Sequence, residues 1–278
     1  MARLSLMCQL SHCSAYGAVA VLALAAAGCG GGGLSTSSTA PTNQSALGIW
    51  SGTDSESGLA LQAFVNSAGQ ADFIRADGVQ YIGTVQVSGD TLTLTVDGYT
   101  NVGNPFTGGV TYGIGTVNGT VTTGTSISAT LTFTPTGGTQ VSSTWTLTYL
   151  PLSTTASSVA TVAGTYTSGT AFVGGDDPLS GASVTISSTG VISGQDSSSG
   201  CAINGNVTDG DSTTDVYEVA YTLSGCTDAT YTDLDGLQFT GLAVFNVNDT
   251  PNQLVIGVTA QAATGGPYYG LVTALTAT

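Results

Sequence analysis

The sequence predicts an all-β fold made of two tandem antiparallel meander domains. Three observations carry this prediction. Apolar and hydroxyl side chains alternate over many short segments, no stretch after Cys29 shows sustained helical spacing, and 40 glycines punctuate the 278 residues. Only 7% of the residues are charged, against roughly 25% in typical soluble domains, and Thr, Ser and Gly take their place. This composition favours half-buried strands joined by tight turns.

The alternation has a period of two, which places one apolar row on one face of a sheet. Leu92, Leu94 and Val96 alternate with threonines, and residues 127–133 and 144–149 repeat the pattern. Because successive strand residues point to opposite faces, each of these segments has one apolar and one hydroxyl face.

Turn-bounded segments divide the chain after residue 46 into two β domains, 47–150 and 159–278, with a linker at 151–158 (PLSTTASS). We predict about eight strands in each domain. Those of the first are 47–53, 59–66, 70–75, 80–87, 91–97, 110–118, 127–133 and 143–150. Those of the second are 162–167, 181–187, 190–195, 201–207, 215–223, 237–246, 253–261 and 268–276.

The two domains resemble each other in sequence, which indicates an internal duplication. Each opens on a glycine two residues before an aromatic, and each has further matching turns. The matching segments are Gly48-Ile49-Trp50 with Gly164-Thr165-Tyr166, 66–69 with 187–190, 81–83 with 203–205, and 88–90 with 209–211.

Short connections favour a meander, and eight strands can close into a small barrel that removes its own edges. The Gly-x-Trp and Gly-x-Tyr openings are similar to the start of lipocalin-type barrels, a resemblance that covers three residues per domain. A two-sheet sandwich is the alternative. A membrane-spanning barrel is less expected, because many strands fall short of the roughly 9–11 residues required.

Residues 1–28 have the features of an export signal: Arg3, then an apolar run at Ala18–Ala27 that is short for a bilayer span. The run ends in Ala26-Ala27-Gly28-Cys29, which resembles the lipobox of bacterial lipoproteins, with Ala26 where Leu is commonest. The resemblance implies cleavage before Cys29 and lipid attachment to it. Residues 29–46 would then be the lipidated cysteine and a flexible Gly/Ser/Thr tether.

The resemblance also implies the outer membrane, because Gly30 stands where an Asp retains such proteins at the inner membrane. Whether the protein faces the periplasm or the cell surface stays open. The alternatives are an ordinary secretory signal, with Cys29 a bystander, or a retained anchor helix.

Charge and residue types exclude several functions. Without residues 1–28 the chain keeps one basic residue, Arg75, against 17 acidic ones, a net charge of about −16. Such a chain repels nucleic acid. The only histidine, His12, lies in the signal, and the chain has no lysine, so the usual general base and Schiff-base residues are missing. We therefore expect no catalytic, cofactor or metal site, and no enzyme.

Cys201 and Cys226 are the cysteines that remain after Cys29, an even pair in an exported chain. They flank a predicted hairpin whose turn lies near 209–211. A structural disulfide is the preferred interpretation, and two buried thiols or a redox pair are the alternatives.

Acidic residues gather at Asp176-Asp177, at Asp209, Asp211 and Asp215, and at Asp233 and Asp235. Calcium would suit these oxygens. The preferred interpretation is that they are turn residues, because Asp bonds the nearby backbone. Aromatic side chains could line a ligand cavity, although strand aromatics more often belong to the core; those considered are Trp50, Trp145, Tyr268 and Tyr269.

These observations favour a non-catalytic envelope lipoprotein that binds a small apolar ligand or a protein partner. A structural or surface-coat lipoprotein is the second hypothesis, and a carboxylate-dependent hydrolase a remote third. A cavity would favour ligand binding. Packed interiors would favour a coat or recognition by loops, and two carboxyls about 5–10 Å apart in a cleft would favour the hydrolase.

Overall fold

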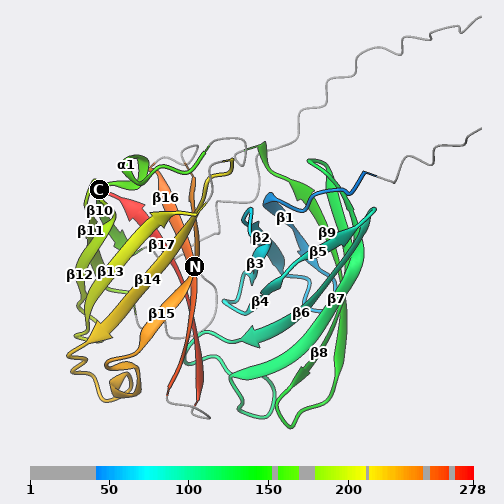
Figure 1. Cartoon of the computed structure of the whole chain (residues 1–278). Coiled ribbons are helices and arrows are strands. Elements are labelled where there is room, and N and C mark those ends of the chain that lie inside the picture. The colour runs from blue at the N-terminus through cyan, green and yellow to red at the C-terminus, as the bar shows by residue number, and fades with distance from the viewer. Residues whose placement is uncertain (1–41, 152–155, 169–178, 211–212, 247–250, 263–266) are drawn as a thin grey trace, which may run out of the picture. The chain divides into compact units, whose positions relative to one another are not determined.

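Antiparallel strands make up both halves of the protein in this computed structural model, which describes residues 42–151, 156–168, 179–210, 213–246, 251–262 and 267–278 (Figure 1). Thr42–Thr278 form one compact unit. The α-helix α1 spans only Val159–Val162, and none of the helices in the described ranges is long and apolar enough to cross a membrane.

The predicted strands are present with small shifts at their ends. The first half contains β1 (Gly48–Asp54), β2 (Ala60–Val65), β3 (Gln70–Arg75), β4 (Gln80–Thr84), β5 (Gln86–Ser88), β6 (Thr91–Tyr99), β7 (Tyr112–Thr122), β8 (Ser126–Pro135) and β9 (Val141–Tyr149). The second contains β10 (Gly164–Ser168), β11 (Ala182–Ile186), β12 (Val191–Asp196), β13 (Ala202–Asp209), β14 (Val216–Ser224), β15 (Gln238–Asn246), β16 (Gln253–Gln261) and β17 (Tyr268–Ala277).

Each half closes into an eight-stranded antiparallel barrel. In the first barrel β1 pairs with β9, and β4 pairs with β6 to complete the ring. In the second barrel β10–β17 follow in chain order and β10 pairs with β17. Both sheets are closed by these pairings, so the barrel prediction is confirmed over the sandwich.

The single strand predicted over residues 80–87 is interrupted. Gly83 lies opposite Val96 and Gln86 opposite Thr93, so β4 and β5 keep one register along β6. Between them the Val85 N–H donates to the Gly69 carbonyl at 2.8 Å, which ties this point to the β2–β3 turn.

Period-two burial fills both barrels with side chains. In β6 the leucines and Val96 are buried while the alternating threonines are exposed. The first core holds both tryptophans, Phe73 and Phe133, and the second holds Tyr166, Tyr217 and Phe239.

The halves match in structure where they match in sequence. Trp50 and Tyr166 are both fully buried on the first strand of their barrel. The Trp50 indole N–H donates to the Ala46 carbonyl at 2.8 Å, and the Tyr166 hydroxyl donates to the Val162 carbonyl at 2.8 Å. In both cases the acceptor lies four residues earlier, which supports the duplication.

The turns after the second strand of each barrel are also equivalent. Asn66 Oδ1 accepts the N–H groups of Ala68 and Gln70, and Ser187 Oγ accepts those of Thr189 and Val191. Gly69 and Gly190 close these turns with φ of +77° and +84°, a conformation that favours glycine.

The predicted tether, 29–46, ends earlier than expected. Gln44 N–H donates to the Gly89 carbonyl at 2.7 Å, Ser45 N–H donates to Thr123 Oγ1 at 2.7 Å, and Ala46 is buried. Residues 43–46 are therefore packed on the first barrel. The signal, Cys29 and residues 30–41 of the tether lie outside the described residues.

Candidate functional site

One end of the first barrel holds a cavity of about 540 Å³. Alternate turns of an antiparallel meander lie at the same end, so four connections meet there: β1–β2, β3–β4, β6–β7 and β8–β9. We term this end the mouth. Its lining residues include Asp54, Glu56, Arg75, Asp77, Val79, Tyr81, Asn104, Phe106, Leu131, Phe133, Val141 and Ser143.

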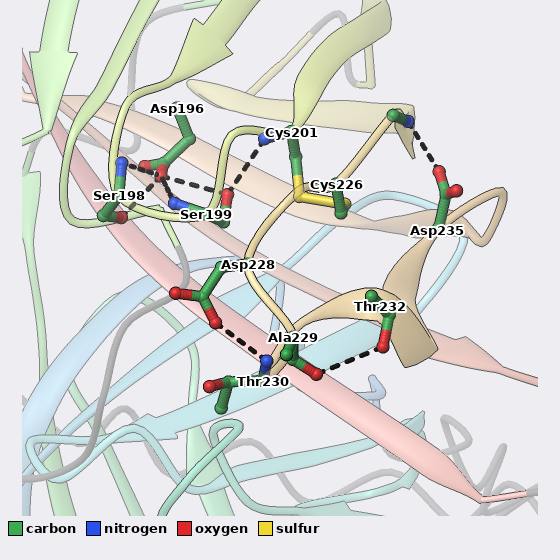
Figure 2. The surroundings of a disulfide bond; sticks show 11 residues. Asp196, Ser198, Ser199, Cys201, Cys226, Asp228, Ala229, Thr230, Thr232 and Asp235 are labelled. Carbon is green, nitrogen blue, oxygen red and sulfur yellow. Dashed lines mark hydrogen bonds between the residues drawn. A yellow bond between two sulfur atoms is a disulfide. The ribbon is translucent and has the colours of Figure 1, made fainter.

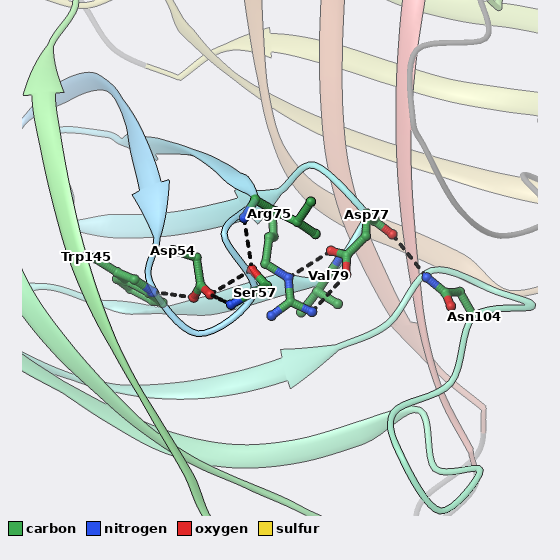
Figure 3. Close-up of polar contacts among 8 residues, drawn as sticks. Asp54, Ser57, Arg75, Asp77, Val79, Asn104 and Trp145 are labelled. Atoms are coloured by element: carbon green, nitrogen blue, oxygen red, sulfur yellow. Dashed lines mark hydrogen bonds and ion pairs between the residues drawn. The ribbon is translucent and has the colours of Figure 1, made fainter. Parts of the chain in front are cut away.

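Asp54 ends β1 and is fixed by donors from two elements (Figure 3). Its Oδ1 accepts the Ser57 N–H at 2.9 Å and the Ser57 hydroxyl at 2.7 Å, and its Oδ2 accepts the Trp145 indole N–H at 2.9 Å. Burial alone would raise the pKa of this carboxyl. The hydrogen bonds from Ser57 and Trp145 outweigh burial, and the pKa lies below its ordinary value.

Arg75 and Asp77 form a bidentate ion pair across the β3–β4 turn (Figure 3). Arg75 Nε donates to Asp77 Oδ1 at 2.9 Å and its NH2 group donates to Oδ2 at 2.8 Å. The Arg75 side chain is only 13% exposed. Burial opposes its charge, but the Asp77 hydrogen bonds and charge prevail and raise the pKa of Arg75. The guanidinium is thus a fixed positive charge in the cavity wall.

Aromatic side chains form the wall beneath these ions. Tyr81 contacts Phe133 with ring centroids 5.3 Å apart and Trp145 with centroids 5.5 Å apart. Phe106, from the β6–β7 connection, lies 5.1 Å from Phe133. Burial raises the pKa of Tyr81, so its phenol stays neutral.

The β6–β7 connection, residues 100–111, borders the mouth as a long loop. Phe106 and Val110 form a β-bridge, with Gly108 and Gly109 at positive φ between them. The Asn104 side-chain amide donates to the Asp77 carbonyl at 3.3 Å (Figure 3). The loop is therefore hydrogen-bonded directly to the turn that carries the ion pair.

The arrangement suits an amphipathic ligand. Three carboxylates and one guanidinium line the cavity, a net charge of about −2, beside an aromatic wall. This charge disfavours anions, and the aromatic faces attract apolar or cationic groups. Because the barrel interior below is filled by the core, a ligand would sit at the mouth and not deep in the barrel.

The predicted cysteine pair is joined in a disulfide, Cys201–Cys226 (Figure 2). The two residues flank the β13–β14 hairpin as expected, since Ala202 lies opposite Ser224. Next to it, Asp196 Oδ1 accepts the N–H groups of Ser198 at 2.8 Å and Ser199 at 2.7 Å. Cys29 lies outside the described residues.

Two members of the predicted acidic clusters accept backbone N–H groups. Asp209 Oδ1 accepts the Val159 N–H at 2.6 Å, and Asp235 Oδ1 accepts the Gly225 N–H at 2.6 Å. Asp215 is buried, and burial raises its pKa. In the described ranges no three acidic, histidine or cysteine side chains come together as a metal-binding group, and residues 176, 177 and 211 lie outside those ranges.

The predicted aromatic candidates divide between core and surface. Trp50 and Trp145 are fully buried, and Trp145 lies behind the cavity lining, where it contacts Asp54 and Tyr81. Tyr268 stacks on Tyr112 with centroids 3.9 Å apart, and Tyr269 packs partly against the core of the second barrel. None of these four residues lines the mouth cavity directly.

Sequence reasoning missed Asp54, Arg75 and Asp77 as site residues. One signal was available: Asp54-Ser-Glu-Ser-Gly58 recurs as Asp196-Ser-Ser-Ser-Gly200. In both turns the Asp accepts the N–H and hydroxyl of the serine three residues on, and the glycine has positive φ. Nothing in the sequence links either motif to residue 75 or 77.

No model of a known protein family matches this sequence, and comparison with curated proteins finds no match either.

Proposed function

We propose that this protein is a non-catalytic, lipid-anchored envelope protein whose first barrel binds a small amphipathic ligand at its mouth. The observation that carries the proposal is the cavity of about 540 Å³ with its aromatic wall and fixed ions. Cavities of roughly 300–1,000 Å³ with a few fixed polar groups are typical of small-molecule sites.

Two features support the mouth as an accessible, non-catalytic binding site. Asp54 and Asp77 are each held by specific donors, and the lowered pKa of Asp54 makes its carboxyl a poor proton donor near neutral pH. Further from the mouth, the described end of the tether bonds Gly89 and Thr123, in turns at the opposite end of the barrel.

A larger side chain in the cavity should weaken ligand binding. We expect Val141→Trp to weaken binding of the neutral probe N-phenyl-1-naphthylamine by about tenfold or more, measured by fluorescence titration. Val141 lines the cavity and is 37% exposed, so the indole would enter the cavity without disturbing the core.

Val191→Trp is the matched control, because Val191 is an exposed valine on the second barrel. Its affinity should equal that of the wild type. Absence of probe binding to the wild type, or equal binding by all three proteins, would reject the mouth as the site and favour the surface-coat hypothesis. The anionic probe 1-anilinonaphthalene-8-sulfonate should bind more weakly than the neutral one.

The anchor requires its own experiment. Cells grown with a palmitate analogue should label the wild-type protein and not a Cys29→Ser variant. Protease treatment of intact cells then assigns the exposed face, since digestion from outside requires surface exposure. An unlabelled wild-type protein would contradict the lipid anchor.

A further inference from the structure

An apolar seam joins the two barrels within the compact unit Thr42–Thr278. Ile49, Phe64 and Ile74 of the first barrel form one buried cluster with residues of β14–β17. The second-barrel members are Val216, Leu242, Val244, Val255, Val272 and Ala274. Outward faces of strands are thus buried here, where each barrel alone would present them to water.

A carboxyl group lies in this seam without a partner. Asp72, on the outward face of β3, is buried, and neither of its oxygens has a hydrogen-bond partner in the described structure. It packs directly on Gly257 of β16, where a Cβ would overlap Asp72 Oδ2. The Gln80 amide donates to the Val258 carbonyl at 3.3 Å, and its Oε1 is also unpartnered.

The elements around Asp72 supply no positive charge. Strands β2, β15 and β16 carry no titratable residue. Apart from Arg75, the titratable residues of the other strands at this seam are acids and phenols: Asp54 of β1, Tyr81 of β4, Asp97 and Tyr99 of β6, Tyr217, Glu218 and Tyr221 of β14, and Tyr268 and Tyr269 of β17. Arg75, at the end of β3, is held by Asp77 at the mouth.

Burial is therefore uncompensated, and it raises the pKa of Asp72 to about 8. An ionised carboxylate with two unpartnered oxygens would be strongly disfavoured in this position, whereas a neutral carboxyl is tolerated.

The same seam holds the loop that borders the mouth. Asn101 forms a β-bridge with Gly270 of β17, and its Oδ1 accepts the Val272 N–H at 3.1 Å. Thr111, at the other end of the loop, donates its hydroxyl to the Tyr268 carbonyl at 2.9 Å. Both ends of residues 100–111 are thus fastened to the second barrel.

We infer that the seam is a proton-controlled latch, closed while Asp72 is protonated, whose opening releases the β6–β7 loop at the mouth. In an open seam the carboxyl meets water and regains its ordinary pKa near 3.8. Ionisation then favours opening by about tenfold per pH unit between about pH 4 and pH 8, with no further change above that range. Regulation of the mouth by the latch rests on the proposed function, whereas the latch itself does not.

Hydrogen exchange followed by mass spectrometry tests the latch without any ligand. Protection of peptides covering 100–111 and 268–276, corrected for intrinsic exchange, should fall as the pH rises from 5 to 8. In Asp72→Asn the fall should disappear. Glu218→Gln is the matched control, because Glu218 lines the same 330 Å³ groove as Asp72 but is exposed, and it should behave as the wild type.

Gly257→Ala tests the packing at Asp72 directly, because the added methyl group would overlap the Asp72 carboxyl. In this variant residues 100–111 should be poorly protected from exchange at every pH. Carbon-13 NMR of the Asp72 carboxyl in the wild type keeps the test decisive if the variants fold poorly. Protection independent of pH in the wild type, or an Asp72 pKa near 4, would overturn the latch. Neither result bears on whether the probe binds at the mouth, which the fluorescence titrations test separately.

Discussion

The two barrels share one design but hold one equivalent long loop differently. By strand order the β6–β7 loop (100–111) is equivalent to the β14–β15 loop (225–237). In the second barrel, Cys226 is bonded to Cys201, and Leu234 and Tyr231 join the core. In the first barrel no cysteine is available, and the loop borders a cavity of about 540 Å³.

This comparison teaches that the scaffold alone does not create a site. Eight strands with period-two burial produce a filled interior in both halves. The barrels differ in the attachment of this loop, which is a disulfide in the second and hydrogen bonds at both loop ends in the first. The first barrel combines a loop fixed at its ends with an ion pair in the neighbouring turn, and both border the cavity.

The repeated Asp-Ser-x-Ser-Gly turns offer the strongest test of this comparison. Asp54→Ala and Asp196→Ala each remove several hydrogen bonds to a buried carboxylate, and each should lower the free energy of unfolding by about 3–5 kcal/mol. We expect each variant to lose hydrogen-exchange protection in its own barrel, measured under native conditions. Equal losses of protection in both barrels from either variant would show that the barrels unfold as one unit.

Only the first of these turns should also affect the mouth, because Asp54 accepts the Trp145 indole and lines the cavity. Its pKa is lowered on folding, so its contribution is present above about pH 4 and is lost as the pH falls through the folded value. The free energy of unfolding of Asp54→Ala should therefore fall less than that of the wild type as the pH is lowered below about 4.

Removing the disulfide should have a smaller effect. The Cys201→Ala/Cys226→Ala variant opens a loop with a sequence separation of 25 and should lower stability by about 3 kcal/mol in the chain-entropy model. Urea denaturation with circular dichroism measures the total, and exchange assigns it to 225–237. Unchanged stability, or loss of protection confined to the first barrel, would contradict a role of the disulfide in holding the β14–β15 loop.

Much of the fold could be predicted from the residues themselves. The alternation of Leu92, Leu94 and Val96 with threonines predicted β6, and the Gly-x-Trp and Gly-x-Tyr openings predicted equivalent first strands. Cys201 and Cys226 were predicted as a pair because they flank one hairpin. These features are local, or depend on neighbouring strands, so short-range geometry determines them.

The mouth could not be predicted in the same way. Asp54, Arg75, Asn104 and Phe133 lie on four separate elements, and only barrel closure brings them around one cavity. Arg75 is the lone basic residue after residue 28, but nothing in the sequence singles out its partner Asp77 among 17 acidic residues.

By itself, therefore, the sequence determined the all-β class, the division into two barrels, nearly every strand and the cysteine pair, because period-two patterning and turn chemistry act over a few residues. Tertiary structure alone decided the arrangement of the mouth and the burial of Asp72. Strand alternation places Asp72 outward, where water would solvate it, and only the packing of β16 against β3 buries its carboxyl on Gly257. Burial depends on what covers a surface, and that information is spread over segments about 180 residues apart.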